Sequence, residues 1–433
     1  MIVTGRSQTS RHRLRRFFST PFFSALGPGL TSGAADDDPS GISTYSIAGA
    51  QFGLATLWTT LLTIPLMISV QLMCARLGKV SGRGLAGVIR VRNSPAVLWF
   101  ACLLLVVANV VNIGADLAGM AETTALITGV NAYFFTPLYA VLMLGLLFWS
   151  SYRRIANVFK WLALVLFAYV LAGFLAHPNW AAVLRYTVIP HIEWSSGYLA
   201  TLVAIFGTTI SPYLFFWQAA QEVEEDKDKG RTTLMQRQGA TDQELANSET
   251  DVITGMLFSN LIMFFIILTT ATTLNAHGHT AIVSARQAAE ALRPLAGEGA
   301  YWLFALGIIG TGLLSVPVLA GSTAYAIAEG AGWRHSLQSK PRSAPRFYGV
   351  LGFAMALGLV MNYLHFSPVA MLFWSAVVNG VLAPPLIVLV ILLTSDQKVM
   401  GDRVSSPLLR TLGWATAVVM TLAAVGMFAT MGS

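Results

Sequence analysis

Three consecutive aspartates, Asp36, Asp37 and Asp38, stand within a largely apolar stretch of the chain. A single aspartate at the centre of a bilayer costs at least about 2.5 kcal/mol, so three are tolerated only where they face water or a cation. Pro39, which follows them, lacks an amide hydrogen, and Gly41 is a poor helix former. A helix should therefore break here and free backbone carbonyls. Freed carbonyls beside carboxylates predict a site for a hard cation.

A second stretch carries the same kind of interruption. In the sequence GTTISPYLFF, Gly207, Ser211 and Pro212 fall in the middle of an apolar run over residues 196–221. A proline kink is common in membrane helices and is an alternative interpretation of Pro212 taken alone. Interrupted helices at matching positions of two halves indicate an inverted-repeat transporter with its site near the middle of the membrane.

The elements that position these residues must be membrane-spanning helices. Of the 433 residues, 55% are hydrophobic and 11% are charged, against roughly 25% charged in soluble domains. A backbone in hydrocarbon has to satisfy its own hydrogen bonds, and the sequence lacks the alternation of a barrel, which leaves an all-α polytopic membrane protein. About eleven spans are predicted. They cover residues 27–50, 53–76, 96–127, 132–151, 159–176, 196–221, 251–275, 300–328, 347–364, 368–394 and 409–431.

The predicted spans divide into two five-helix inverted repeats. Spans one to five form residues 27–176 and spans six to ten form residues 196–394, with broken helices at the first and sixth positions, as in folds of the LeuT type. A basic tail over residues 1–26 precedes the repeats, and the eleventh span over residues 409–431 follows them. The polar segment 222–250 is expected to be a solvated connection.

Basic residues in the connections predict the orientation. With the N-terminus in the cytoplasm, 24 of the 27 lysines and arginines lie on the cytoplasmic side, and the exceptions are Arg185, Arg286 and Arg293. The positive-inside rule requires this asymmetry. We therefore expect a multi-pass protein of the inner (plasma) membrane. The net charge of +7 is a topology signal and gives no reason to expect a nucleic-acid partner, whereas the oligomeric state is left open.

An enzymatic function is not expected. The sequence contains neither a His-Glu-x-x-His nor a Gly-x-Ser-x-Gly constellation, and no cofactor is predicted beyond a transported ion. A sodium-coupled symporter of organic solutes on the same scaffold is an alternative. Its interrupted first helix would present small residues and amides to a substrate carboxylate, which three aspartates would repel.

Three stretches give the chain a resemblance to the natural resistance-associated macrophage protein (NRAMP) family of divalent-metal transporters. They are residues 27–29 with Asp38-Pro39 and residues 48–53, then Asp116-Leu117-Ala118 in the third span, and residues 394–401 after the tenth. The family counterparts of the first two motifs are Asp-Pro-Gly-Asn and Asp-Leu-Ala-Glu. The resemblance implies a secondary transporter that carries a divalent metal into the cytoplasm by alternating access.

The departures from the family motifs concern the metal ligands. Ser40 and Gly41 occupy the places of the family's glycine and asparagine, and Ser211 and Tyr213 those of its span-six methionine and histidine. Oxygen ligands suit Mg²⁺ and Mn²⁺, whereas sulfur favours softer metals. This pattern resembles the magnesium-transporter branch related to NRAMP, and we therefore expect an all-oxygen site for Mg²⁺ that also accepts Mn²⁺. Its candidate ligands are Asp38, Asp37, Asp36, Gly41, Thr208 and Ser211.

The residues that carry protons in typical relatives are also altered. Tyr213 replaces the span-six histidine, and Gly119 replaces the glutamate of the span-three motif. Tyrosine, with a pKa near 10, does not exchange protons at neutral pH as histidine does. We expect weak or absent proton coupling. Asp116 and Glu122 could restore a relay, which leaves an ordinary proton-coupled Mn²⁺/Fe²⁺ importer as the alternative.

Buried amides are a further group of candidate path residues. Gln218 and Asn379 are expected to line the pathway together with Tyr213. Asn109, Asn112 and Asn260 could also line the pathway, although hydrogen bonding between helices is the commoner role of asparagine in membranes.

Overall fold

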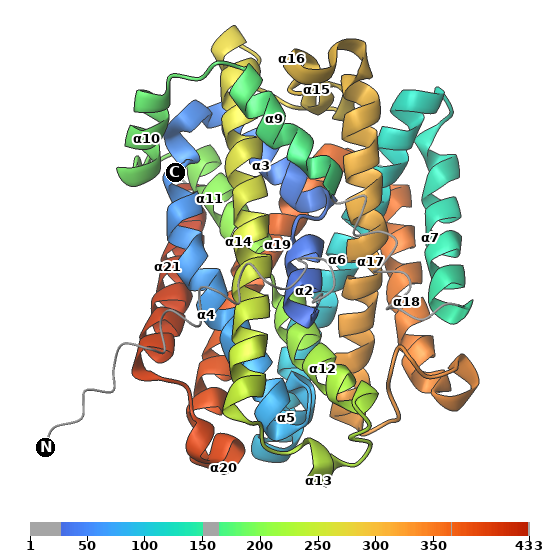
Figure 1. The fold of residues 1–433 in the computed structure, drawn as a ribbon. Coiled ribbons are helices and arrows are strands. Elements are labelled where there is room, and N and C mark those ends of the chain that lie inside the picture. Colours follow the sequence, from blue (N-terminus) through green and yellow to red (C-terminus); the bar gives the residue numbers. More distant parts are fainter. Residues whose placement is uncertain (1–26, 150–163, 365, 432–433) are drawn as a thin grey trace, which may run out of the picture.

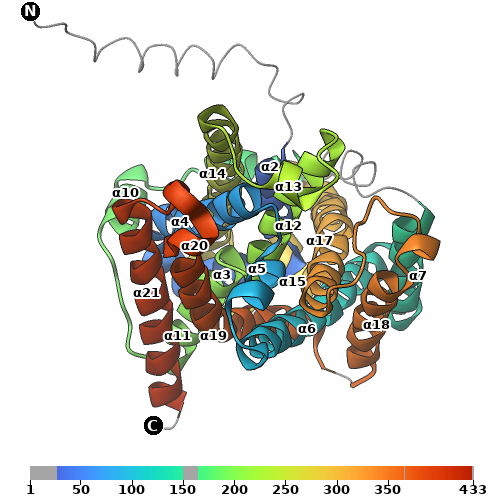
Figure 2. The same cartoon turned by 90° about the horizontal axis from the view of Figure 1, so that it is seen from below.

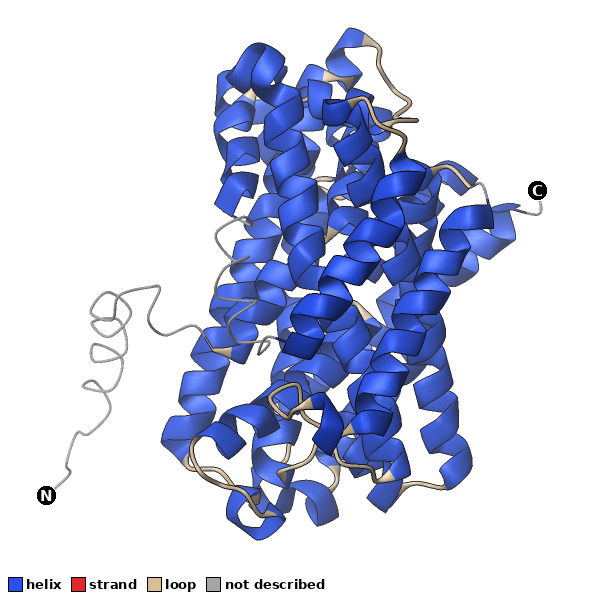
Figure 3. Ribbon diagram, turned by 90° about the vertical axis from the view of Figure 1, so that its right-hand side faces the viewer, coloured by secondary structure: helices blue, strands red, loops and turns tan. Residues whose placement is uncertain are grey.

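The computed structural model describes residues 27–149, 164–364 and 366–431, and every regular element in these ranges is a helix (Figures 1 and 3). The predicted basic tail, the last two residues of the fourth predicted span and the beginning of the fifth lie outside the described residues. Most of the long helices run along one common direction and form a single bundle, with short helices at its two ends (Figure 1).

The helices fall into two successive series. The first is α2 (Pro28–Asp36), α3 (Pro39–Phe52), α4 (Trp58–Ser81), α5 (Leu85–Arg92), α6 (Pro95–Thr128), α7 (Ala132–Trp149), α9 (Phe167–Leu175) and α10 (Trp180–Val188). The second is α11 (Ser196–Thr209), α12 (Pro212–Asp228), α13 (Leu234–Arg237), α14 (Asp242–Thr273), α15 (Ala285–Glu290), α16 (Arg293–Ala296), α17 (Ala300–Ala331), α18 (Pro345–Met361), α19 (Pro368–Ser395), α20 (Gln397–Met400) and α21 (Pro407–Met431).

The described helices confirm the predicted membrane frame. Nine of them, with α11 and α12 counted as one, are long and apolar enough to cross a bilayer, and a bent pair comprising Leu164–Leu175 and Trp180–Val188 makes a tenth candidate. The first predicted span is present as α2 and α3, each too short to cross alone. The chain is thus a multi-pass membrane protein.

The interrupted helices occupy the interior of the bundle. The apolar part of α11 and α12 is entirely buried, whereas α7 and α21 expose much of their surface. The exposed side chains on these outer helices are apolar, for example Phe134 and Val141 on α7 and Leu422 on α21. Such faces suit contact with lipid. The unwound segments of the two broken helices are therefore shielded by the surrounding helices.

Close backbone contacts hold the broken helices against their neighbours. A Cβ added to Gly29 or Gly33 of α2 would overlap the backbone of α14 around Val252 and Gly255. One added to Gly207 of α11 would overlap the backbone of α19. Small residues four apart allow this approach between membrane helices.

The segment 222–250, expected to be a solvated connection, is largely helical, and its acidic beginning is buried. Helix α12 continues to Asp228 and α14 begins at Asp242, so helix occupies most of the segment. Three of its acidic side chains are buried: Glu222, Glu224 and Asp226. Burial is possible because Lys79, at the end of α4, forms ion pairs with Glu222 and Asp226, and Lys227 forms one with Glu224.

Candidate cation site between two broken helices

Both breaks have the same succession of backbone conformations. After α2, Asp37 has φ −81° and ψ 54°, and Asp38 is extended, with φ −70° and ψ 171°, before Pro39 begins α3. After α11, Ile210 has φ −122° and ψ 56°, and Ser211 is extended before Pro212 begins α12. The span at Pro212 is therefore broken, and the alternative of a simple proline kink is wrong. Matching breaks in the two series agree with an inverted repeat.

Asp38 stabilises the first break as the N-cap of α3. Its Oδ1 accepts hydrogen bonds from the Gly41 amide at 2.7 Å and from the Ser40 hydroxyl at 2.8 Å. Its Oδ2 accepts from Asn112 Nδ2 of α6 at 2.8 Å. The side chain is buried, so these donors replace water around the carboxylate. One lone pair of Oδ2 remains free for a further partner.

Asp36 and Asp37 lie against a different helix. The Ser259 hydroxyl of α14 is 2.6 Å from Asp36 Oδ2 and 3.2 Å from Asp37 Oδ1. The other oxygens, Asp36 Oδ1 and Asp37 Oδ2, are buried and have no hydrogen-bond partner among the described residues. The triplet therefore divides, with Asp38 directed to α6 and its two predecessors to α14.

Asp116 adds a fourth buried carboxylate from α6. Its Oδ2 accepts a hydrogen bond from the Ser315 hydroxyl of α17 at 3.0 Å, and Oδ1 has no partner among the described residues. In the ion pairs of the described chain, none of Asp36, Asp37, Asp38 and Asp116 contacts a lysine, arginine or histidine. Four such groups cannot all be ionised in a dry interior without a cation, so the site favours positive charge.

Oxygen atoms from both broken helices lie close around Gly41. A point at the position of a Cβ on this glycine lies 2.9 Å from Thr208 Oγ1, 3.4 Å from the Asp36 carbonyl oxygen and 3.5 Å from Asp38 Oδ1. Both broken helices thus contribute oxygens to one place. Ser211 lies at the second break, where its hydroxyl donates to the carbonyls of Gly207 at 2.7 Å and Thr208 at 2.8 Å.

Tyr213 joins the two broken helices. Its hydroxyl donates a 2.8 Å hydrogen bond to the carbonyl oxygen of Ala35, which the break at the end of α2 leaves without a helical partner. The ring is buried. This tyrosine therefore satisfies a freed carbonyl that would otherwise be available to an ion.

Other predicted residues lie away from this point. Glu122 accepts a hydrogen bond from the Ala285 amide at the start of α15, and Gln218 of α12 contacts Ser32 and Glu222. Asn379 is buried, with neither polar atom hydrogen bonded among the described residues. Within the described ranges, no three His, Cys, Asp or Glu side chains form a group that could hold a metal ion.

The predicted asparagines on neighbouring helices have two different roles. Asn109 donates to Ser322 and Thr323 of α17, and Asn260 donates to Thr63 of α4, which confirms a helix-packing role for both. Asn112 instead binds Asp38 at the site. Ser259 and Ser315 were not foreseen, because isolated serines in apolar spans carry no distinctive sequence signal.

Comparison with solved structures supports this architecture. A manganese transporter of Eremococcus coleocola, in complex with an aromatic bis-isothiourea substituted compound, superimposes with a TM-score of 0.74 at 19% identity, covering 98% of this chain and 88% of that one. MhsT in complex with L-phenylalanine superimposes with a TM-score of 0.61 at 13% identity, covering 92% and 98%. These likenesses show a common fold.

Comparison of sequences identifies the family to which the chain belongs. The protein named divalent metal cation transporter MntH, from Klebsiella pneumoniae, is 26% identical over 412 residues, which is 92% of each chain. The sequence model of the family described as natural resistance-associated macrophage protein-like matches residues 29–430, nearly the whole chain. The chain therefore belongs to the NRAMP family.

Proposed function

We propose that this protein carries a divalent cation across the membrane, with Mg²⁺ as the preferred ion and Mn²⁺ also accepted. Its named relatives are a divalent metal cation transporter and a manganese transporter, and that activity carries over to this chain as part of the proposal. Because membrane transport needs no covalent step, the protein is not an enzyme in this proposal and has no resident cofactor.

The convergence of oxygens at Gly41 carries the proposal. Thr208 Oγ1, the Asp36 carbonyl and the Asp38 carboxylate are hard oxygen donors from both broken helices, and Ser211 stands where the family has a methionine. Oxygen ligands favour Mg²⁺ and Mn²⁺ over softer metals. Mg²⁺ is usually held through one or two carboxylates with several waters kept, which Asp38 and the free oxygens of its neighbours could provide.

The first test is influx of Mg²⁺ into proteoliposomes under an inside-negative potential, with Mn²⁺ as competitor and protein-free liposomes as control. A potential of 100 mV favours entry of a divalent ion by about 4.6 kcal/mol, so uptake should be saturable and potential-dependent. Entry of Mn²⁺ without Mg²⁺ would contradict the ion assignment and indicate an ordinary transition-metal importer. An absence of flux for both ions would favour the organic-solute symporter.

Proton coupling is proposed to be weak or absent. Tyr213 takes the place of the relay histidine and its hydroxyl is engaged by the Ala35 carbonyl. Glu122 is bound to the Ala285 amide, so it does not continue a path from Asp116. A pH-sensitive dye enclosed in the same proteoliposomes should therefore show no acidification when Mg²⁺ or Mn²⁺ is added. Acidification that depends on the metal and on the protein would refute this part of the proposal.

We further propose that the end of the bundle carrying α5, α13 and α20 faces the cytoplasm. Arg83, Arg90, Arg231 and Arg403 lie at or near these elements, and the positive-inside rule places such clusters inside. Ions released toward this end would enter the cell.

A further inference from the structure

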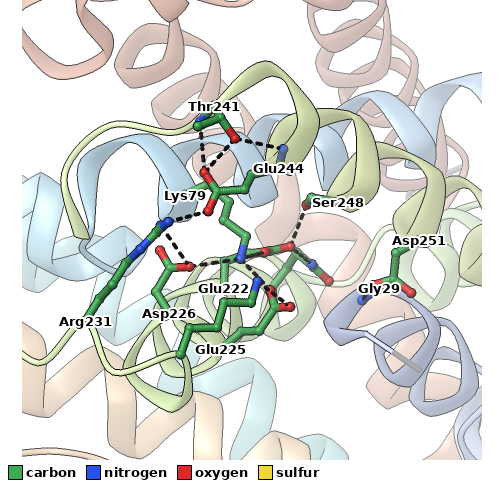
Figure 4. A network of polar contacts seen from close by, with 12 residues as sticks. Gly29, Lys79, Glu222, Glu225, Asp226, Arg231, Thr241, Glu244, Ser248 and Asp251 are labelled. Carbon is green, nitrogen blue, oxygen red and sulfur yellow. Dashed lines mark hydrogen bonds and ion pairs between the residues drawn. The ribbon is translucent and has the colours of Figure 1, made fainter. Parts of the chain in front are cut away.

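A buried lysine at the α5 end is surrounded by carboxylates. Lys79, at the end of α4, is 2% exposed, and its ammonium lies 3.0 Å from Glu222 Oε2 and 3.3 Å from Asp226 Oδ1, and also contacts Glu225 (Figure 4). All three acids belong to α12, the half of the second broken helix that follows Ser211. The ammonium thus occupies an anionic pocket on the α5 side of the candidate cation site.

Hydrogen bonds extend this contact to the first broken helix. Gln218 Nε2 donates to Glu222 Oε1 at 2.9 Å, and the Ser32 hydroxyl of α2 donates to Gln218 Oε1 at 2.6 Å. The Ser248 hydroxyl of α14 also donates to Glu222 Oε1, at 2.8 Å. These contacts therefore connect α2, α4, α12 and α14 on the α5 side of the candidate cation site.

Two further contacts fasten the same helices. Asp251 of α14 accepts hydrogen bonds from the Gly29 amide at 2.6 Å and the Leu30 amide at 3.2 Å, at the beginning of α2 (Figure 4). Arg231 lies between Asp226, at 3.6 Å, and Glu244 of α14, at 2.5 Å. Asp251 thus joins α14 to the beginning of α2, and Arg231 joins the end of α12 to the beginning of α14, so both contacts hold these helices together at the α5 end.

We propose that Lys79 closes the α5 end of the transport pathway by acting as an internal cation between α4 and α12. This inference rests on the proposed transport function, because it presumes that an ion leaves the site between α2, α12 and α14. While the pathway is closed, the ammonium compensates the buried carboxylates, and when α12 separates from α4, water must solvate both partners. The α5 end therefore has a closed and an open conformation, and an ion at the site can shift the equilibrium between them.

The experiment measures access to the pathway and needs no knowledge of the ion. Cys74 and Cys102, both buried, are replaced by alanine, and one reporter cysteine is introduced in each detergent-solubilised variant. Ala35→Cys on α2 reports the route that the network closes, and Ala48→Cys, buried on α3 beyond the site, reports the opposite end. The rate of alkylation is compared with the native Lys79, with Lys79→Gln and with Lys79→Gln combined with Glu222→Gln.

We expect Lys79→Gln to accelerate alkylation of Ala35→Cys by about tenfold and to leave Ala48→Cys unchanged, because excess negative charge favours the opened, hydrated arrangement. The double variant restores the original charge balance and should return the rate toward the native value. Unchanged labelling at Ala35→Cys, or equal acceleration at both reporters, would overturn the proposal, the latter by indicating general loosening. If Lys79→Gln does not fold, the single variant Glu222→Gln provides the comparison. It should accelerate alkylation of Ala35→Cys to a smaller extent and leave that of Ala48→Cys unchanged. Transport of either ion by the native protein is measured separately, so failure of the proposed function would be recognised independently.

Discussion

Replacement of Asp38 by asparagine is expected to abolish uptake of the divalent ion while the first helix break persists. An asparagine is as good an N-cap as aspartate, so its oxygen can still accept from the Gly41 amide and the Ser40 hydroxyl. The side-chain amide of Asn112 can rotate by half a turn, because its Oδ1 is buried without a hydrogen bond. This oxygen would then accept a hydrogen bond from the amide of the new asparagine. What the substitution removes is the negative charge.

The measurement is initial uptake at subsaturating ion, together with the thermal unfolding midpoint of the purified variant. Loss of about 2.7 kcal/mol of ion attraction would lower affinity about a hundredfold. Asp38→Ala serves as the comparison, because it removes the charge and the cap together and should lower the midpoint as well. Uptake by Asp38→Asn at the native rate would show that this carboxylate is a structural cap and that the ion binds elsewhere.

The largest effect on stability is expected from Gly207→Ala. A Cβ here would overlap the carbonyl oxygen of Ala376 and the amide of Gly380, both backbone groups of α19 that cannot turn aside. Separating two packed helices to admit one methyl group should destabilise the protein by about 1–3 kcal/mol or more. The thermal unfolding midpoint in detergent, followed by the loss of the monodisperse peak in size-exclusion chromatography, would record this change.

Gly352→Ala is the matched control. A Cβ on Gly352 of α18 would meet nothing within 4 Å, and alanine is a better helix former by about 1 kcal/mol. The control should therefore leave the midpoint unchanged or slightly raised. Equal destabilisation by both substitutions would mean that the loss comes from glycine itself and not from the contact between α11 and α19.

The helix breaks could be predicted from the sequence because their causes are local. Pro39 and Pro212 cannot donate the amide hydrogen bond of a continuous helix, and a buried Asp38 needs either donors or a cation beside it. The spans were predictable for the same reason, since hydrocarbon imposes one length and one composition on each of them.

The arrangement of the acidic side chains could not be predicted in this way. Adjacent aspartates in an unwound segment can face any neighbouring helix, and only tertiary packing directs Asp36 and Asp37 to Ser259 and Asp38 to Asn112. The acidic segment that ends α12 has the composition of a solvated loop. Its burial depends on Lys79, more than 140 residues earlier in the chain, and no local pattern reveals that partner.

The contact between α2 and α14 has a kinetic consequence. Gly29, Gly33 and Gly255 carry no side chain where the backbones of α2 and α14 approach each other, and the two helices lie side by side (Figure 2). Side chains that interlock between two helices must pass one another when the helices slide, and glycines at the contact lower the energy barrier to sliding. Helix α2 could then shift along α14 as one unit across a low energy barrier. The polar contacts at its ends, and not the packing along its length, would set how often it moves.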